Sequence, residues 1–405
     1  MANNNNTKNL NVPNLRFPEF KGEWEKCKLE ECVVFLDGKR KPIKSSERVS
    51  EQKLYPYYGA SGIIDYIDDY LFDGKFILLS EDGANILDRN YRVAFIAEGK
   101  IWVNNHAHVL QSNDNIDINF IAEKLESLDY SIYNTGTTMP KLNQEVCRNI
   151  PLWLPPTEEQ VKIGTLLSLL NERITTQSKI IEKYESLIKG IGNKLFSFKM
   201  RFKTNDGNDF PSWKTKSFEN IGKTFSGLSG KAKEDFGIGK PFIQYKQVFD
   251  SPQIQIQNCG LVNVSDSENQ NNVKYGDVFF TVSSETPDEI GMSSVLLDEV
   301  DEMYLNSFCF GYRLSSFEVL NPLYASYFFR DSSFRNKVVK IAQGSTRYNI
   351  SKSEFIKLKI SLPCIEEQAR IASFLSAVDE KIKEEKEILA LYLIQKNHLL
   401  RQMVI

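Results

Sequence analysis

Two long stretches of the chain repeat apolar residues at alternating intervals of four and three. The first seam runs through Ile163, Leu167, Leu170, Ile174, Gln177, Ile181 and Tyr184. The second seam runs through Ile371, Leu375, Val378, Ile382, Glu385, Leu389 and Tyr392. A repeat of about 3.5 residues keeps one stripe of a helix against a partner helix. The pattern therefore predicts two coiled-coil helices, at 156–200 and 364–405.

Each seam turns polar at one central position, Gln177 in the first and Glu385 in the second. Antiparallel pairing of the two helices would bring these residues together, where a hydrogen bond would fix the register. Thr157 and Gln160 have the spacing of a capping box just after two prolines, which predicts the first helix start. The alternative is that each helix packs separately on its own core. The stripes are longer than a globular helix needs, so we favour pairing.

The second helix pattern repeats the first at a constant offset of 208 positions, and the sequence before each helix is repeated too. Gly136-Thr137-Thr138 falls on Gly344-Ser345-Thr346, and Glu158-Glu159-Gln160 falls on Glu366-Glu367-Gln368. One departure is Lys396, which stands where the first helix has an isoleucine. An ungapped correspondence that ends in the same long helix twice indicates an internal duplication.

Between the helices, apolar stretches bounded by turn residues predict strands and short helices. Strands are predicted at 75–80, 90–97, 101–111, 277–283 and 304–314, and helices at 119–128 and 322–342. The expected fold is α+β: two mixed α/β globules, at 14–155 and 201–363, joined by two long antiparallel coiled-coil helices in a pseudo-two-fold duplication. The asparagine-rich start, 1–13, is expected to be a disordered tail.

Composition narrows the function only a little. The 405 residues carry a net charge of −3, whereas proteins that bind DNA by bulk electrostatics are usually basic. Any DNA contact must therefore come from local patches or be shared with a partner. The six cysteines form no CxxC pair, which argues against disulfides or zinc and fits a reducing cytoplasm. No apolar run approaches the ~18 residues of a membrane span.

Catalytic motifs were sought and not found. The segment Gly227–Lys231 has the wrong spacing for a phosphate-binding loop, and Gly237-Ile238-Gly239 does not complete a dinucleotide fingerprint. The adenine-methyltransferase tetrapeptide Asn-Pro-Pro-aromatic is missing as well. His106 and His108 stand two apart on a predicted strand and should share a face, but the third histidine, His398, lies in the distant coil. We favour packing or base contact for this pair over a metal site, and we expect no catalytic centre.

Both globules contain basic, amide and hydroxyl side chains of the kinds that contact phosphates and read base edges. In the first half the candidates are Lys39, Arg40, Lys41, Lys44, Tyr57, Tyr58, Ser61, Arg89, Asn90, Asn104, Asn105, His106, Thr137, Thr138 and Lys141. In the second half they are Lys231, Lys233, Tyr245, Lys246, Gln247, Ser283, Ser284, Thr286, Ser345, Thr346, Arg347, Tyr348 and Asn349. Solubility is an equally good interpretation of each single charge.

Together these features resemble the specificity subunits of type I restriction–modification systems, over nearly the whole chain. The resemblance rests on Phe17-Pro18-Glu19-Phe20 with Trp24, on the Gly-Thr/Ser-Thr element before each helix, and on the paired Leu-Pro…Glu-Glu-Gln helix starts. Two further segments, 57–62 and 276–281, are similar to target recognition sequences of that family. Each motif alone is weak, but their order, found twice, is specific.

The resemblance implies that each globule is a target recognition domain that reads one half of a bipartite, asymmetric target in double-stranded DNA. It also implies that the coil sets the spacing of the two domains and docks two methyltransferase subunits, which restriction subunits join. No cofactor is expected on this chain, because S-adenosylmethionine, ATP and magnesium would belong to the partner subunits. The expected location is the cytoplasm, with no membrane contact.

Three alternatives stay open at this point. A scaffold whose globules bind protein would keep the duplication and the coil, but it would need no basic or amide-rich loops. Its binding would also lack the steep salt dependence of DNA binding. A nuclease or methyltransferase in its own right is disfavoured by the missing motifs. A specificity subunit that has lost its function is the third alternative, and no truncated half suggests it.

Overall fold

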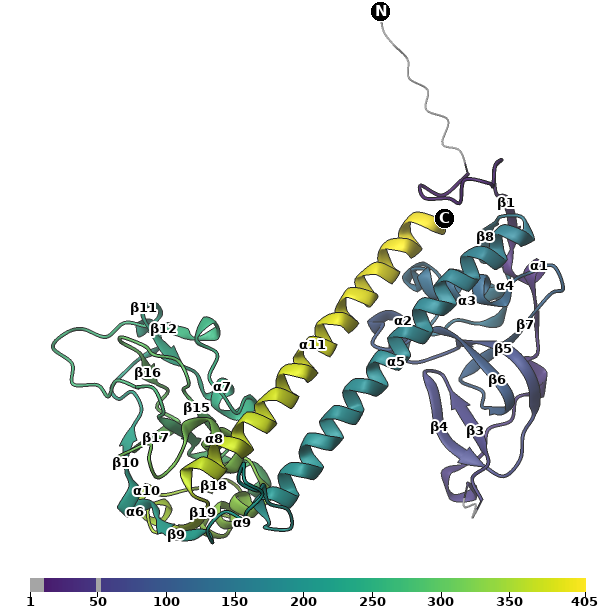
Figure 1. Cartoon of the computed structure of the whole chain (residues 1–405). Coiled ribbons are helices and arrows are strands. Elements are labelled where there is room, and N and C mark those ends of the chain that lie inside the picture. The colour runs from purple at the N-terminus through teal and green to yellow at the C-terminus, as the bar shows by residue number, and fades with distance from the viewer. Residues whose placement is uncertain (1–10, 49–51) are drawn as a thin grey trace, which may run out of the picture. The chain divides into compact units, whose positions relative to one another are not determined.

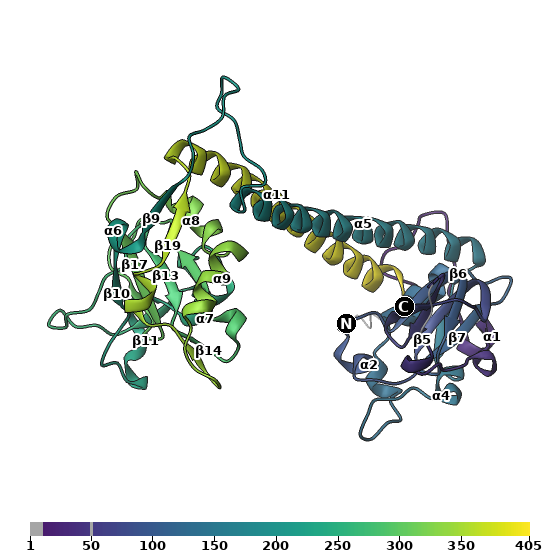
Figure 2. The same ribbon diagram turned by 90° about the horizontal axis from the view of Figure 1, so that it is seen from below.

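The computed structural model describes residues 11–48 and 52–405, and the chain divides into two compact units. Unit 1 consists of Met1–Lys179 and Lys386–Ile405, and unit 2 consists of Ile180–Glu385. Each unit contains one globule and part of each long helix, α5 (Thr157–Phe196) and α11 (Ile365–Met403) (Figure 1, Figure 2). Both long helices predicted from the apolar repeat are thereby confirmed.

The globule of unit 1 is built on one six-stranded sheet with the order β2-β7-β5-β6-β3-β4 (Figure 1). Its strands are β2 (Val33–Phe35), β3 (Tyr55–Gly59), β4 (Gly62–Ile67), β5 (Phe72–Ser80), β6 (Ala94–Val103) and β7 (Ala107–Ser112). Only β3 and β6 run parallel among these neighbours. The remaining elements are β1 (Glu25–Lys28), paired with β8 (Pro151–Leu154), and helices α1 (Leu29–Cys32), α2 (Asn85–Asp88), α3 (Ile118–Ser127) and α4 (Gln144–Arg148).

The globule of unit 2 repeats this strand order with its sheet in two pieces, β10-β17-β13-β15 and β12-β11-β16. The first piece contains β10 (Gly222–Ser226), β13 (Val278–Thr281), β15 (Ser293–Val295) and β17 (Cys309–Leu314), and the second contains β11 (Phe236–Ile243), β12 (Gly260–Val262) and β16 (Tyr304–Leu305). β13 and β17 take the places of β5 and β7, while β15 and β16 together take the place of β6. The parallel pair β11–β16 matches β3–β6. The two halves therefore share one topology where they share little sequence.

The other elements of unit 2 complete the correspondence. They are β9 (Lys214–Ser217), β14 (Ser283–Ser284), β18 (Tyr348–Asn349) and β19 (Lys359–Leu362), with helices α6 (Phe218–Ile221), α7 (Tyr245–Asp250), α8 (Pro322–Phe328), α9 (Ser332–Ile341) and α10 (Lys352–Phe355). β19 pairs with β9 as β8 pairs with β1. The described part of the chain contains no helix whose length and hydropathy would let it span a membrane.

Both long helices begin on the same hydrogen-bond pattern. Gln160 Nε2 donates to the carbonyl of Pro155 (2.8 Å), and its Oε1 accepts from the backbone N–H of Asp117 (3.1 Å), the N-cap of α3. Gln368 makes the matching bonds, and its Oε1 accepts from Asn321 (2.9 Å), the N-cap of α8. One glutamine in each half thus ties the long helix to a helix of the globule.

The glutamate before each glutamine is fully buried and binds an arginine from the segment that leads into its globule. Arg16 donates to both carboxylate oxygens of Glu159 at 2.7 Å. Arg201 donates to both oxygens of Glu367 at 3.0 and 2.7 Å. These bidentate pairs explain why Glu-Glu-Gln recurs at the same place, since each charge is matched in a site that excludes water.

Burial along the two long helices follows the predicted seams. Every seam position is buried or half-buried, whereas Leu169 on α5 and Leu391 on α11 are more than half exposed. Within unit 1, Ile163 of α5 shares a core with Leu400 of α11, and within unit 2 the ends of the two helices share a core as well. A hydrogen bond between the two buried polar residues of the seams stays a prediction.

Several local predictions are wrong. The tail predicted at 1–13 is too long, because Asn11 already accepts a backbone bond from Trp24 (2.8 Å), while residues 1–10 lie outside the described residues. The capping box is not formed: Thr157 Oγ1 donates to Asn115 (2.9 Å), and Gln160 bonds to the globule instead. The strand predicted at 90–97 starts only at residue 94.

Three predicted elements are interrupted. The strands expected at 101–111 and 304–314 are each broken by a turn, so that β6 gives way to β7 and β16 to β17. The helix expected at 322–342 is divided into α8 and α9, because Asp331 caps a new helix by accepting from Ser333 N–H (2.8 Å). Both broken strands are interrupted at the same place in the topology.

Candidate nucleic-acid interface

In unit 1 a short turn follows β6 and is hydrogen-bonded to two neighbouring segments. Asn104 Oδ1 accepts from the backbone N–H of His106 (2.8 Å). The N–H of Glu81, just past β5, donates to the carbonyl of His106 (2.9 Å), and Asn104 N–H donates to the carbonyl of Tyr58 (3.1 Å). His106 lies in this turn, half exposed, while His108 is buried on β7. The prediction that the two histidines share a strand face is therefore wrong.

Unit 2 contains the same turn after β16. Asn306 Oδ1 accepts from the backbone N–H of Phe308 (2.8 Å). The N–H of Val282, just past β13, donates to the carbonyl of Phe308 (3.0 Å), and Asn306 N–H donates to Ile243 at the end of β11 (2.9 Å). The Phe308 side chain is 61% exposed. Each bond has its counterpart in unit 1.

The segment that follows the Gly-Thr/Ser-Thr element of each half pairs with the segment beside the turn. In unit 1 the N–H of Leu142 donates to the carbonyl of Glu81 (2.7 Å), and in unit 2 the N–H of Ile350 donates to that of Val282 (3.0 Å). β14 and β18 form a small ladder at the same place. The exposed hydroxyls of these elements belong to Thr137, Thr138, Ser345 and Thr346. The structure thus places the turn of each half next to the segment that follows its Gly-Thr/Ser-Thr element.

Two surface hollows border Phe308 in unit 2. One, of 450 Å³, is also lined by Tyr245, Phe249, Ser283, Ser284, Glu285, Glu289 and Arg347. The rings of Tyr245 and Phe249 are stacked 6.1 Å apart, and Tyr245 Oη donates to the carbonyl of Ser283 (3.0 Å). The other hollow, of 590 Å³, includes Lys231, Phe236 and Gln244. Aromatic faces, hydroxyls, amides and cations meet here, and these groups contact bases and phosphates.

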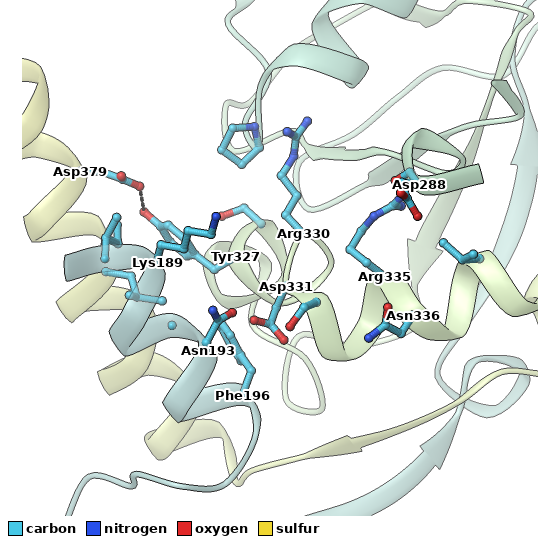
Figure 3. Close-up of a pocket in the computed structure, with 17 residues that line it drawn as sticks. Lys189, Asn193, Phe196, Asp288, Tyr327, Arg330, Asp331, Arg335, Asn336 and Asp379 are labelled. Atoms are coloured by element: carbon cyan, nitrogen blue, oxygen red, sulfur yellow. Dashed lines mark hydrogen bonds between the residues drawn. The ribbon is translucent and has the colours of Figure 1, made fainter. Parts of the chain in front are cut away.

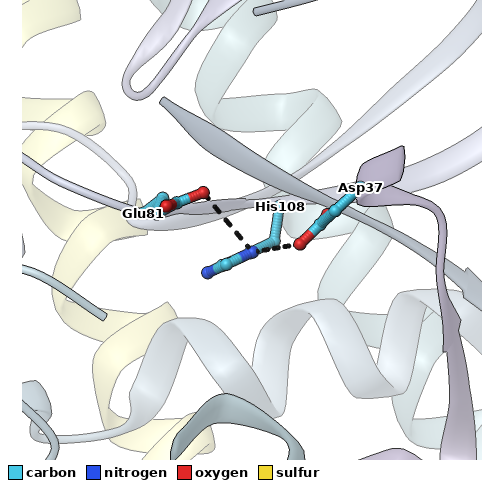
Figure 4. Close-up of side chains that lie close together, drawn as sticks. All are labelled: Asp37, Glu81 and His108. Carbon is cyan, nitrogen blue, oxygen red and sulfur yellow. Dashed lines mark hydrogen bonds and ion pairs between the residues drawn. The ribbon is translucent and has the colours of Figure 1, made fainter. Parts of the chain in front are cut away.

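A buried ion network supports the turn in unit 1 (Figure 4). His108 Nδ1 donates to Asp37 Oδ2 (2.6 Å), and its Nε2 donates to the carbonyl of Leu142 (2.8 Å). Arg40 lies between the two carboxylates, 2.6 Å from Glu81 and 3.4 Å from Asp37. The network therefore connects β7, the segment after β5 and the segment that contains Leu142.

The charges in this network follow from the competition between burial and pairing. Burial alone would lower the pKa of His108, but interactions with Asp37 and Cys147 raise it to about 10. Burial alone would raise the pKa of Asp37, but its bond with His108 leaves it below the ordinary value. The imidazole is thus charged and donates from both nitrogens. Asp37, Glu81 and His108 form an ion network with Arg40.

Five predicted contact residues are either buried or bonded to other residues of the fold. Tyr57 is 2% exposed and Asn104 is 4% exposed. Arg40 belongs to the ion network, and the ammonium of Lys231 lies 2.6 Å from a glutamate carboxylate. Arg89 donates to the end of α3. Burial places Tyr57 and Asn104 out of reach of DNA. DNA contact by Arg40, Lys231 and Arg89, whose charges are paired within the fold, stays a prediction.

The other candidates are at or near the surface. Exposed candidates are Lys39, Lys41, Lys44, Ser61, Asn90, Asn105, His106, Thr137, Thr138, Lys141, Lys233, Lys246, Thr286, Ser345, Thr346, Arg347 and Asn349, and the more buried ones are Tyr58, Tyr245, Gln247, Ser283, Ser284 and Tyr348. The segment that carries Lys39, Lys41 and Lys44 lies beside the turn of unit 1, because the Lys41 N–H donates to the carbonyl of Val103 (3.4 Å). Sequence analysis missed Phe308, although asparagine followed by a small polar residue is a turn signal.

The sequence profile of the type I restriction–modification DNA specificity domain matches the chain twice, over residues 21–186 and 192–391. The chain belongs to this family. The specificity subunit is similar to a Haemophilus influenzae protein assigned as a type I restriction enzyme specificity subunit, with 27% identity over 87% of the chain and 86% of that protein. It is also similar to the MjaVIII specificity subunit of Methanocaldococcus jannaschii, with 24% identity over 92% of the chain and 90% of the relative.

Solved structures agree on the fold. The type I restriction–modification S subunit of M. genitalium superposes on the specificity subunit with a TM-score of 0.63 at 14% identity, covering 97% of this chain and 99% of that one. The duplicated architecture predicted from the seams and the repeated motifs is therefore confirmed. The specificity subunit carries two copies of the recognition domain, each followed by a long helix.

Proposed function

We propose that this specificity subunit reads a split, asymmetric DNA target, one half with each globule. The observation that supports this is the repeated turn, which has the same backbone bonds in both units but exposes His106 in one and Phe308 in the other. Base contacts specify a sequence and depend on the side chain offered. Two equal frames with unlike side chains would select two different half-sites.

The proposal assigns recognition to this chain and chemistry to its partners. Two methyltransferase subunits with S-adenosylmethionine, and restriction subunits with ATP and magnesium, would complete the complex in the cytoplasm. The net charge of −3 supports shared DNA binding, since this chain alone lacks a basic excess. The long helices would set the distance between the two recognition domains.

A stripe on α11 within unit 1 is suited to docking a methyltransferase subunit. Ile388, Leu391 and Ile394 are 36%, 64% and 64% exposed, and their spacing of three places them on one face of the helix. The seam residue Leu389 lies on the face that α5 covers. Apolar side chains gathered on an exposed helix face mark an interaction surface rather than a solvated one.

Co-expression with the methyltransferase subunit, followed by genome-wide mapping of methylated adenines, tests the proposal. Methylation at one split motif that disappears without this chain is the expected result. Replacing the globule between residues 25 and 135 should then change one half of the motif and leave the other. No new methylation, together with binding that does not weaken steeply with salt, would favour the protein-binding scaffold.

A further inference from the structure

We infer that His106 and Phe308 each specify a base, one in each half of the target. This inference rests on the proposed function and names, within each recognition domain, the position that makes the contact. Both residues lie third in the turn that begins with an asparagine, Asn104 or Asn306, and that turn interrupts the strand in each unit.

The backbone of this turn is fixed while its side chain is free. In each unit the residue's N–H is bound by the asparagine side chain at 2.8 Å, and its carbonyl accepts from the segment after the central strand at 2.9 or 3.0 Å. Each asparagine follows the end of a parallel strand pair, where its own backbone N–H donates to the carbonyl of Tyr58 or Ile243. A side chain that selects a base must extend from a backbone that is held in one position, because base-edge contacts are short and directional.

The residues around Phe308 in unit 2 support its assignment to a base contact. Phe308 borders both surface hollows, and one of them also contains Arg347 and the stacked rings of Tyr245 and Phe249. An exposed phenylalanine inside a DNA interface makes apolar contact with the C5 methyl group of thymine, which no other base of DNA carries in the major groove. Phe308 is therefore expected to select thymine at one position.

His106 offers a different chemistry. Its Nδ1 lies 2.8 and 3.0 Å from the two carboxylate oxygens of Asp82, so that nitrogen carries the hydrogen. Among the described residues nothing bonds to Nε2, which in the neutral ring is an acceptor. An acceptor in the major groove matches the amino groups of adenine N6 and cytosine N4. Asp82 is a positioning residue that orients the ring.

The test uses the complex of the full chain with its methyltransferase subunit and compares Phe308→Ala with the natural sequence. Adenine methylation mapping should show that thymine preference falls about tenfold or more at one position of one half-site. The other half-site should stay the same. Phe317→Ala is the matched control, because Phe317 is 44% exposed but packs on Gly276, at the opposite end of β13. The control should leave the motif unchanged.

Unchanged preference at every position in a folded, methylating Phe308→Ala complex would overturn the inference. Changes spread over both half-sites would overturn it as well. If the variant does not methylate, selection from a pool randomised over the half-site decides, since a pool that still keeps every preference contradicts the inference. Failure of the natural complex to methylate any split motif would instead refute the proposed function itself. His106→Phe should create a thymine preference in the other half-site.

Discussion

The two globules share a backbone and a set of hydrogen bonds, but the chemistry beneath their exposed turns is opposite. His108 in unit 1 pairs with β5 where Phe310 in unit 2 pairs with β13. Both are 1% exposed. His108 carries a charge and belongs to an ion network, whereas Phe310 stacks on Phe280 at 5.4 Å and contacts Phe355 at 5.1 Å. Unit 1 supports its turn with paired charges, and unit 2 with aromatic rings.

The two units also differ where each globule meets the long helices. In unit 1, Glu123 of α3 lies 2.9 Å from Lys396, the charged residue that interrupts the apolar seam of α11. In unit 2 a hollow of 570 Å³ is lined by Phe196 together with charged residues such as Arg330 and Asp331, and Tyr327 Oη donates to Asp379 (2.7 Å) (Figure 3). The backbone frame was kept after duplication, while the interior was free to change its chemistry.

The largest expected effect removes the aromatic support. Phe355 is fully buried and its ring lies within 4.6–5.1 Å of those of Phe218, Phe280 and Phe310. Phe355→Ala should destabilise unit 2 by about 4 kcal/mol, because the rings around the cavity cannot close it. Hydrogen–deuterium exchange of β13 and β17 would measure the loss.

The matched control lies 208 positions earlier. Cys147 is also fully buried, and Cys147→Ala should destabilise unit 1 by only about 1 kcal/mol, since a small side chain leaves a small cavity. Equal losses in the two units would show that unit 1 depends on apolar packing as much as unit 2 does.

The second-largest expected effect is the loss of stability when the arginine of either duplicated arginine–glutamate pair is replaced. This loss should differ between the two units. Trp213 Nε1 also donates to Glu367 (3.1 Å), whereas Trp24 Nε1 has no acceptor among the described residues. Arg16→Met therefore leaves the buried Glu159 without a side-chain donor, at a cost of about 3 kcal/mol, while Arg201→Met should cost about 2 kcal/mol. Denaturant unfolding, monitored by hydrogen–deuterium exchange in each unit, would separate the two losses of stability. A larger loss for Arg201→Met would contradict this account of the tryptophan.

The sequence predicted the parts of the fold whose signal is local or repeated. The seams of α5 and α11 extend far enough to show their period, and the offset of 208 aligned the motifs at the helix starts. The strand order was out of reach, because the parallel pairing of Tyr57 with Trp102 leaves no periodic trace in either segment. The ion network was hidden for the same reason, since Asp37, Glu81 and His108 are far apart in sequence.

The candidate site was predicted by residue type but not by position. Apolar stretches flank each short turn closely, at Val103 and Ala107 and at Leu305 and Cys309, so one strand was predicted across each turn. The side chain of Asn104 folds the chain back by binding the backbone two residues ahead, a local competition with strand pairing that composition does not reveal. Burial then decided which predicted contacts were available.

A third effect concerns pH. His108 has a folded pKa of about 10, above its unfolded value, so its contribution is complete below about pH 6.5 and is lost as pH rises toward 10. Between pH 7 and 9.5, the free energy of opening of β5 and β7, measured by hydrogen exchange, should fall by up to about 1.4 kcal/mol per pH unit. That of β13 and β17 should change less. His108→Gln should abolish the difference. Equal pH dependence in both units would refute the charged state of the imidazole.

The smallest effect compares the exposed lysines of the two units. Lys39 and Lys41 lie beside the turn of unit 1, and Lys233 and Lys246 are exposed in unit 2. If each contacts a phosphate, each Lys→Gln change should weaken DNA binding by less than about 1 kcal/mol and reduce the slope of log K against log salt by about 0.9. The methylated motif should stay the same, because phosphate contacts position the protein without reading bases.

Titrating the complex with its target at several salt concentrations measures both slopes. A slope that falls for one pair only would show that the two units bind the backbone through different surfaces, and a changed motif would move base recognition from the turns to the lysines.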